Sequence, residues 1–287
     1  MGEIRQLMQA FTPYSLNMGG KLLEVSHPLV MGILNVTPDS FYAGCRAQTD
    51  GETTRRVAQL LEEGADIIDV GACSTRSGAE MVTEEEEKER LEGALGIIRS
   101  MAPEALVSVD TFRSGIVRWA VSQYGVQMVN DVSGGEWDKE MFPAVAEMGV
   151  PYVLTHSQGT PATMQVAPHY DDLLVEMMQY FGSKVQQLHE MGVCDIVLDP
   201  GFGFGKTLDD NYLLLNRLHD LQALEMPILV GLSRKSMIYK VLEKGPEECL
   251  NGTTVLNTLA LTQGASILRV HDVKEAVETV KLMQRAL

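Results

Sequence analysis

Seven apolar runs of the chain each end on polar side chains that could bind or activate a substrate. One such run stops on the carboxylate of Asp199, and a glycine-rich turn that ends in Lys206 follows it, in residues 199–206. Carboxylates and amides can bind the donor and acceptor edge of a heterocycle, while lysine, arginine and histidine can bind an anion. The other runs end on Asn35, Asp110, Asn130 with Asp131, His156, Ser233 with Lys235, and Arg269 with His271.

Simpler interpretations apply to several of these residues. An acid after a strand often caps the next helix, so Asp110 or Asp199 taken alone is as readily structural as functional. Lys235 could form a Schiff base, as in a barrel aldolase, but its neighbourhood is also typical of an anion-binding turn at a helix start, which its charge favours. Residues 201–207 miss the phosphate-binding loop pattern, because three residues instead of four separate the glycines. Acids, an amide and a lysine at one rim together favour shared chemistry.

Composition limits the classes of partner. The chain has 287 residues and a formal net charge of −16, from 23 Lys+Arg against 39 Asp+Glu, so binding to nucleic acid or to anionic lipid is not expected. The 4 cysteines form no C-x-x-C pair, which argues against a zinc site or a disulfide framework. The sequence shows no signal pattern and no apolar run near the roughly 20 residues that span a bilayer. We therefore expect a cytoplasmic protein without a membrane segment.

Short β-branched runs alternate with segments of helical spacing, which is typical of βαβ units. Strands are predicted to begin near Leu29, Asp66, Leu106, Gln127, Tyr152, Asp195, Ile228 and Ser266, and helices are predicted over 54–63, 84–99, 114–123, 139–148, 171–191, 210–224, 247–264 and 273–285. This repeat predicts an α/β fold, a (β/α)₈ TIM barrel in a single domain of residues 1–287, with its site on the loops after the strands. Residues 1–28 are predicted to form a β-hairpin at the bottom of the barrel.

Several motifs, in order along the chain, resemble those of dihydropteroate synthases. They are M-G-I-L-N-V-T-P-D-S-F at 31–41, S-T-R at 74–76, S-V-D-T at 108–111, V-N-D-V-S-G-G at 129–135, the 199–206 stretch, G-L-S-R-K at 231–235 and R-V-H-D at 269–272. The resemblance runs from about Tyr14 to the C-terminus. It implies a pterin-binding barrel that condenses 6-hydroxymethyl-7,8-dihydropterin diphosphate with p-aminobenzoate. The products are 7,8-dihydropteroate and diphosphate, in folate biosynthesis, and sulfonamides compete with p-aminobenzoate.

The resemblance implies a polar slot for the pterin beside a site for the diphosphate. A carboxylate can accept two parallel hydrogen bonds from the amidine-like edge of a pterin, the role implied for Asp199, and an arginine can stack on the ring. The implied pterin-binding residues are Asp110, Asn130, Asp199, Lys235 and Arg269. The diphosphate is implied to meet Asn35, Arg269 and His271, with Mg²⁺ as the cofactor on Asn35.

The resemblance also implies a site for the second substrate. Its p-aminobenzoate-binding residues are Phe41, Thr75, Arg76, Phe204 and Ser233, and the implied catalytic set is Asp39, Arg76, Asp110, Lys235, Arg269 and His271. We expect diphosphate to leave first, so that the aniline nitrogen attacks a pterin methylene cation that Asp39 and Asp110 offset. Loops carrying Phe41 and Arg76 would close and exclude water. Replacing Arg76 with Ala should spare pterin binding and abolish condensation.

The chain departs from the family pattern at three places. Ala72 and Cys73 replace a Gly-Glu pair before the S-T-R motif, and Ser77 replaces a proline that often borders the sulfonamide pocket. Thr155 and Ser157 flank His156 where methionines are common. These changes predict a loop that closes differently and a more polar pocket wall, and they leave the response to sulfonamides open.

Two other functions fit parts of the pattern. A pterin-dependent methyltransferase uses a related barrel, but it needs a corrinoid partner and has less use for the S-T-R and S-R-K motifs. A non-catalytic pterin-binding protein would bind pterin without giving product. The number and order of the motifs favour the synthase. The presence of Asn35, Arg76, Lys235 and His271 argues against a loss of catalytic activity. The family is commonly homodimeric through barrel helices, so a homodimer is expected.

Overall fold

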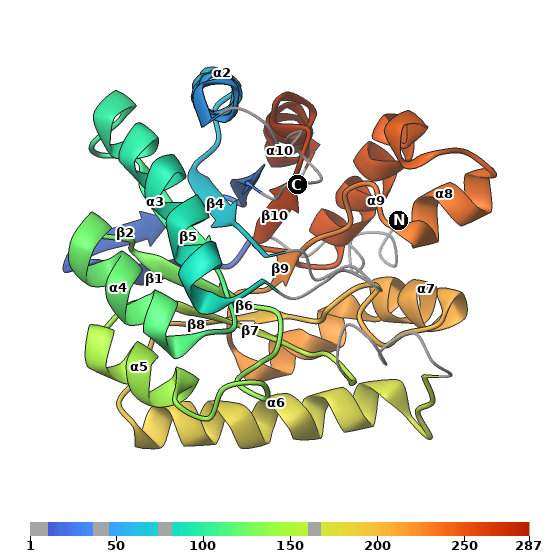
Figure 1. Cartoon of the computed structure of the whole chain (residues 1–287). Helices are drawn as coiled ribbons and strands as arrows, with labels where there is room; N and C mark the ends of the chain where they lie inside the picture. The colour runs from blue at the N-terminus through green and yellow to red at the C-terminus, as the bar shows by residue number, and fades with distance from the viewer. Residues whose placement is uncertain (1–10, 37–45, 74–81, 160–167, 287) are drawn as a thin grey trace.

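The protein folds as a nearly closed barrel of parallel strands with helices around it (Figure 1). The computed structural model describes residues 11–36, 46–73, 82–159 and 168–286. Within these ranges eight strands form one sheet, in the order β8-β7-β6-β5-β4-β3-β10-β9. They are β3 (Leu29–Asn35), β4 (Ile67–Gly71), β5 (Leu106–Asp110), β6 (Met128–Asp131), β7 (Tyr152–Thr155), β8 (Ile196–Asp199), β9 (Leu229–Val230) and β10 (Ile267–Val270).

The two ends of this sheet meet. A parallel bridge joins Leu198 of β8 to Ile228, just before β9, and the backbone N–H of Leu198 donates to the carbonyl of Pro227 at 2.9 Å. The predicted (β/α)₈ barrel is confirmed, and each predicted strand begins within a residue of its expected start. Because all eight strands are parallel, their carboxyl ends face one mouth of the barrel.

Helices follow the strands and cover the outside of the barrel (Figure 1). They are α2 (Arg46–Glu62), α3 (Glu84–Met101), α4 (Ser114–Tyr124), α5 (Met141–Met148), α6 (Leu173–Glu190), α7 (Leu208–Asn216), η2 (Leu218–Leu224), α8 (Ser236–Leu242), η3 (Pro246–Glu248), α9 (Leu250–Thr262) and α10 (Val273–Ala286). Polar caps fix several starts: Thr83 accepts from the N–H of Glu86 ahead of α3, and Thr207 and Asp210 form a capping box on α7.

Three helix predictions are wrong in their bounds. The single helix expected over 210–224 is a shorter α7 followed by the 3₁₀ helix η2, and the one expected over 247–264 divides into η3 and α9. Helix α2 begins eight residues earlier than the expected 54, and α8 lies where only a helix-opening turn was expected. Apolar spacing alone does not distinguish α from 3₁₀ geometry, nor does it mark a break between two adjacent turns.

The N-terminal hairpin lies at the opposite mouth, as predicted. Strands β1 (Tyr14–Met18) and β2 (Lys21–Val25) pair antiparallel through a turn at Gly19 and Gly20, both with positive φ. Its apolar side chains pack on residues near the strand starts, in one cluster that contains Leu16, Met18, Val25, Leu29, Met31, Ile67, Met128, Val153, Val197, Leu229 and Ile267. The hairpin therefore seals the bottom of the barrel and leaves the carboxyl ends as the open mouth.

Among the described helices, none combines the length and the apolar character that crossing a bilayer requires.

Candidate active site

An ion-pair cluster joins residues of three strands, β4, β5 and β10. From β10, Arg269 donates through Nε to Oδ2 of Asp69 on β4 at 2.6 Å, and through Nη2 to Oδ2 of Asp110 on β5 at 2.6 Å. Asn130 of β6 donates to the same Asp69 oxygen at 3.0 Å. The Asp69 side chain is fully buried, while Asp110 and Arg269 are each about 20% exposed. Residues far apart in sequence thus form one polar floor to the mouth.

Burial and like charges set the titration of this cluster. The pKa of Asp110 is raised to about 7, chiefly by burial; Arg269 opposes this rise, and the carboxylates of Asp69, Glu87 and Asp131 add to it. Burial lowers the pKa of Arg269, but Asp69 and Asp110 outweigh burial and leave that pKa above its ordinary range. Arg269 therefore stays charged at neutral pH, whereas Asp110 titrates near neutrality.

Gly71 at the end of β4 lets side chains from both neighbouring strands approach one another. A Cβ on Gly71 would lie 3.3 Å from Cβ of Asp110 and 3.5 Å from Oδ1 of Asn35. Asn35 ends β3 opposite Gly71 in the strand register, and Asp110 does so from β5. An amide oxygen and a carboxylate therefore reach over one glycine, which is the oxygen chemistry that Mg²⁺ prefers.

A second group of predicted residues surrounds the glycine-rich loop after β8. Asp199 is 7% exposed, and its Oδ1 accepts from the N–H of Gly201 at 2.8 Å. Lys235 donates to the carbonyl of Phe202, and its Nζ lies 4.5 Å from the ring centroid of Phe204. Burial lowers the pKa of Lys235 to about 8, whereas burial raises that of Asp199 and Lys235 opposes the rise. The acid, the lysine and the aromatic ring thus line one side of the mouth.

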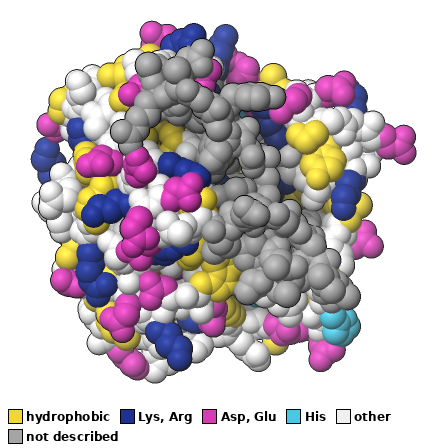
Figure 2. Space-filling view, in the orientation of Figure 1, with side chains coloured by type: hydrophobic (Ala, Val, Ile, Leu, Met, Phe, Trp, Pro, Cys, Tyr) yellow, Lys and Arg dark blue, Asp and Glu magenta, His cyan; other side chains and the backbone are white. Residues whose placement is uncertain are grey.

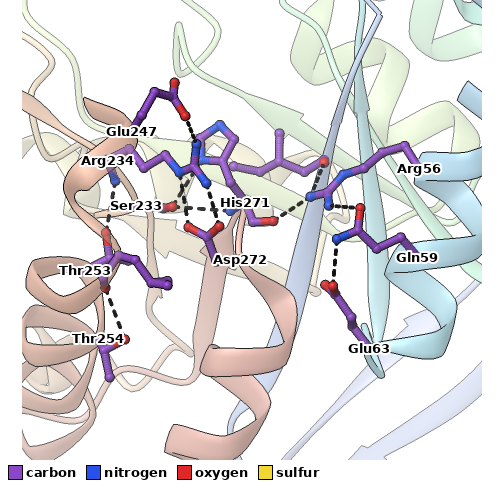
Figure 3. Close-up of polar contacts among 12 residues, drawn as sticks. Arg56, Gln59, Glu63, Ser233, Arg234, Glu247, Thr253, Thr254, His271 and Asp272 are labelled. Atoms are coloured by element: carbon purple, nitrogen blue, oxygen red, sulfur yellow. Dashed lines mark hydrogen bonds and ion pairs between the residues drawn. The ribbon is translucent and has the colours of Figure 1, made fainter. Parts of the chain in front are cut away.

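A third group joins β10 to the turn after β9 (Figure 3). Nδ1 of His271 lies 3.1 Å from Oγ of Ser233, which also accepts from the backbone N–H of His271 at 3.3 Å. The residues that follow Ser233 and His271 form an ion pair: Arg234 donates to Asp272 through Nε at 3.1 Å and through Nη2 at 2.6 Å. From α2, Arg56 donates to the carbonyl of His271 at 2.5 Å. His271 and Ser233 are therefore held in contact by charged residues on both sides.

Burial keeps His271 neutral. Burial, with the nearby charges of Arg269 and Arg234, lowers the pKa of His271 to about 4. The sequence left the protonation of His271 beside a diphosphate open, and this value applies to the protein without that anion.

Four predicted residues, Asp39, Phe41, Thr75 and Arg76, lie outside the described residues, as does Ser77. The described residues on either side of the segment that contains Thr75 and Arg76 are held by arginines. Arg90 donates to the carbonyl of Ala72 at 3.1 Å, and Arg113 donates to that of Val82. At the third departure from the family pattern, Thr155 is 1% and His156 is 5% exposed. The His156 ring packs edge-on against Tyr180, with ring centroids 5.0 Å apart.

Sequence reasoning missed Asp69 and the supporting arginines. An acid inside the apolar run of β4 was the available signal for Asp69, because a carboxylate in a buried strand needs a partner. Asp131, at another strand end, binds its own loop: it accepts from the N–H groups of Ser133 at 2.8 Å and Gly135 at 2.9 Å and from the hydroxyl of Tyr152 at 2.7 Å. It shapes the loop after β6.

Charge is distributed differently at the surface and in the mouth. Figure 2 shows acidic side chains spread over the visible face and mixed with basic ones, in keeping with the net charge of −16. Near the mouth, cations come from β10 (Arg269), from the turn after β9 (Arg234 and Lys235) and from α2 (Arg56). Acids pair with several of these cations, Asp272 with Arg234 and both Asp69 and Asp110 with Arg269, so the mouth presents both charges close together.

Comparison with known proteins places this arrangement in a family. The family model described as pterin binding enzyme matches residues 31–271. The chain is 42% identical over 272 residues to the dihydropteroate synthase of Escherichia coli strain K12, covering 93% of this chain and 95% of that protein. It is 38% identical to that of Bacillus subtilis, covering 90% and 88%.

Solved structures give the same result. The structure of the Xanthomonas albilineans dihydropteroate synthase with 4-aminobenzoic acid is similar with a TM-score of 0.88 and 37% identity, covering 96% of this chain and 98% of that one. A structure of the Xanthomonas albilineans enzyme in complex with 7,8-dihydropteroate is similar with a TM-score of 0.82 and 33% identity, covering 95% and 98%.

Proposed function

The chain belongs to the pterin-binding enzyme family, among its dihydropteroate synthases, and from that premise we propose the reaction it performs in the cytoplasm. It joins 6-hydroxymethyl-7,8-dihydropterin diphosphate to p-aminobenzoate and releases 7,8-dihydropteroate and diphosphate. The observation that carries this proposal is that Asp199 and Lys235 both contact the loop after β8 while Arg269 contacts Asp110 at the same barrel mouth. Acids there can accept from a pterin edge while the cations face an anionic leaving group.

The pterin part of the first substrate binds between two groups of residues, those around Arg269 and those around the loop after β8. Asp199 accepts from the N–H edge of the ring, and Asp110 with Asn130 completes the slot. Lys235 turns from the Phe202 carbonyl to the acceptor edge, and Arg269 lies over the ring plane. The supporting observation is where the barrel carries these residues. Asp110 and Asp199 end their strands, Asn130 and Arg269 are next to last in theirs, and Lys235 caps the start of α8, so a rigid scaffold holds them.

The diphosphate half meets His271, Arg269 and Asn35. Mg²⁺ fits here, because Asn35 and Asp110 offer oxygen atoms on either side of Gly71 and Mg²⁺ commonly takes few protein ligands beside substrate phosphates. Bound there, Mg²⁺ would offset the charge of the leaving group. The protein itself supplies Arg269 as a fixed cation and His271 as a neutral donor held by Ser233. Stabilising the departing anion lowers the main barrier.

The aniline nitrogen of p-aminobenzoate attacks after the diphosphate has left. Asp110, raised in pKa by burial, offsets the developing pterin cation as it ionises. Phe204 packs against the ring of the second substrate, and Ser233 receives its carboxylate at the start of α8. Asp39, Phe41, Thr75 and Arg76 complete this half of the site from loops outside the described residues.

A product assay tests the reaction. Purified protein is incubated with Mg²⁺, the dihydropterin diphosphate and p-aminobenzoate, and mass spectrometry follows dihydropteroate while a coupled assay follows diphosphate. We expect both products in equal amounts. Pterin binding without product would favour a non-catalytic pterin-binding protein, and methyl transfer from a methylated folate to a corrinoid partner would favour the methyltransferase.

We propose that the protein is a homodimer through α7, α8 and α9, which lie next to one another on the barrel surface (Figure 1). Large apolar side chains are exposed there, namely Leu213 at 46%, Val241 at 53%, Val255 at 50% and Leu259 at 45%. Covering such a patch in a second copy removes apolar surface from water. Sedimentation of the wild type should give a dimer and Val255→Asp a monomer, while the exposed control Val175→Asp on α6 stays dimeric.

A further inference from the structure

Lys206, the last residue of the glycine-rich loop after β8, is buried against its own loop. It is 3% exposed, and its Nζ lies 3.0 Å from the carbonyl oxygen of Gly201, 3.1 Å from that of Phe204 and 3.2 Å from that of His156. A fourth contact of 3.0 Å joins Nζ to Nδ1 of His156. Three carbonyl oxygens and an imidazole nitrogen surround one ammonium group, as ligands surround a small bound cation.

The carbonyls converge because glycines let the loop lie tightly on the end of β7. Gly201 has φ +68, and a Cβ there would lie 2.0 Å from the carbonyl oxygen of His156. Gly205 has φ +62, and its Cβ would lie 2.7 Å from the carbonyl oxygen of Gln158. Only glycine permits both the left-handed backbone and the close approach at these positions. The loop is thus wrapped around the lysine that ends it.

Lys235 also holds the same loop. Lys235 donates to the carbonyl of Phe202, whereas Lys206 takes those of Gly201 and Phe204. The two ammonium groups therefore bind different carbonyls of the same loop. When Lys235 turns toward a substrate, the Phe202 carbonyl loses that donor, and the contacts of Lys206 remain to hold the loop.

We propose that Lys206 is a positioning residue whose ammonium group acts as a built-in cation, fixing the loop that presents Asp199 and Phe204 while Lys235 engages substrate. The roles of Asp199 and Phe204 rest on the proposed function. Nδ1 of His156 accepts from the ammonium group, which places the imidazole proton on Nε2. His156 is neutral, because burial and the charge of Lys206 together lower its pKa to about 3. Burial also lowers the pKa of Lys206, to about 7, with Asp199 opposing, while the three carbonyl oxygens around Nζ favour its ammonium form.

Chemical rescue of Lys206→Ala tests this inference. The substitution removes the cation and leaves a cavity lined by its acceptors, and propylammonium has the atoms that the side chain loses. We expect the dissociation constant for dihydropterin, measured by titration calorimetry, to rise on the order of 10²-fold through displacement of Asp199. Propylammonium chloride should restore much of that affinity, whereas tetramethylammonium chloride at equal ionic strength should not, because it has no N–H to donate.

Lys281→Ala on α10 is the matched control, because Lys281 is exposed and lies outside the barrel mouth. It should bind dihydropterin as the wild type does, with or without added amine. Unchanged dihydropterin affinity in Lys206→Ala, or equal recovery with both ammonium salts, overturns the inference. Product formation by the wild type separately tests the proposed function, so the two ideas can fail independently.

Lys206→Met extends the test if the alanine variant does not fold. Methionine fills most of the lysine volume without charge or donors. A folded Lys206→Met protein with wild-type affinity for dihydropterin contradicts a positioning role for the cation, and a folded protein with weakened affinity supports it. If neither variant folds alone, recovery of folded Lys206→Ala in propylammonium but not in tetramethylammonium supports the built-in cation, and equal recovery contradicts it.

Discussion

Arg269 and Asp110 are in direct contact: Nη2 of the arginine donates to Oδ2 of the acid at 2.6 Å. The same guanidinium holds the buried Asp69 at 2.6 Å, so one side chain of β10 joins acids from β4 and β5. Oδ1 of Asp69 is buried and has no hydrogen-bond partner among the described residues. The charges of the mouth therefore depend on one another, and removing one member affects the rest.

Asp69→Ala should destabilise the protein and impair its site. The change leaves Arg269 with one fewer carboxylate in a buried setting, and breaking such a pair costs about 3 kcal/mol. Urea unfolding should show this loss in the free energy of unfolding, and dihydropteroate formation should fall as well. Asp171→Ala, at a side chain that is 100% exposed, serves as the control. Equal urea midpoints for Asp69→Ala and the wild type would show that the pair is not needed.

His271 should stay neutral in the free protein through the physiological range. Its folded pKa of about 4 lies below the ordinary value of 6.5, so the unfolded chain binds the proton more readily. The contribution of His271 to stability is thus full above about pH 6.5 and is lost as the pH falls toward 4. NMR titration, with His271→Gln to assign the signal, should give a low pKa that rises when diphosphate is added. An imidazole that titrates near 6.5 without ligand would contradict the burial argument.

Gly201→Ala should be far more damaging than an alanine at an ordinary glycine. The new Cβ would lie 2.0 Å from the carbonyl oxygen of His156 at a φ of +68, so the backbone must move, at a cost of at least 1–3 kcal/mol. Gly182→Ala in α6 has nothing within 4 Å and should instead stabilise by about 0.5–1 kcal/mol. Thermal unfolding of both variants measures the contrast. Similar melting temperatures would mean that the loop after β8 is not packed as described.

Lys235 should impose an alkaline limit on turnover. Burial lowers the pKa of Lys235 to about 8, so its ammonium form is present below that pH and is lost as the pH rises through it. The pH profile of kcat/KM for the dihydropterin diphosphate should fall above pH 8 in the wild type. Lys235→Met should lose on the order of 10²-fold in turnover at pH 7.

Two further variants separate charge from geometry at Lys235. Lys235→Arg keeps the cation at high pH, so its lower turnover should not show the alkaline fall. Lys281→Met should keep the wild-type profile, because that lysine is exposed. An unchanged alkaline limit in Lys235→Arg would assign the limit to another group.

The sequence by itself determined the barrel and the residues at its mouth. Apolar runs such as 196–198 must be buried on both faces, so a parallel sheet follows, and the polar residue that ends each run must lie at the carboxyl edge. That logic placed Asp110, Asp199 and Arg269 on one rim before any contact was known. The same logic predicted the hairpin, because a short turn between two apolar strands needs only local information.

Only the tertiary structure decided which polar groups pair and which way they face. Asp69 and Arg269 are 200 residues apart, and their contact exists because β4 and β10 both pair with β3. Asp131 and Lys206 are polar like the site residues beside them, but both bind their own loops. Asp131 accepts from the N–H of Ser133, and Lys206 donates to the carbonyl of Gly201. Which side chains pair, and which are protonated, depends on distance and burial. The order of residue types along the chain does not specify either quantity.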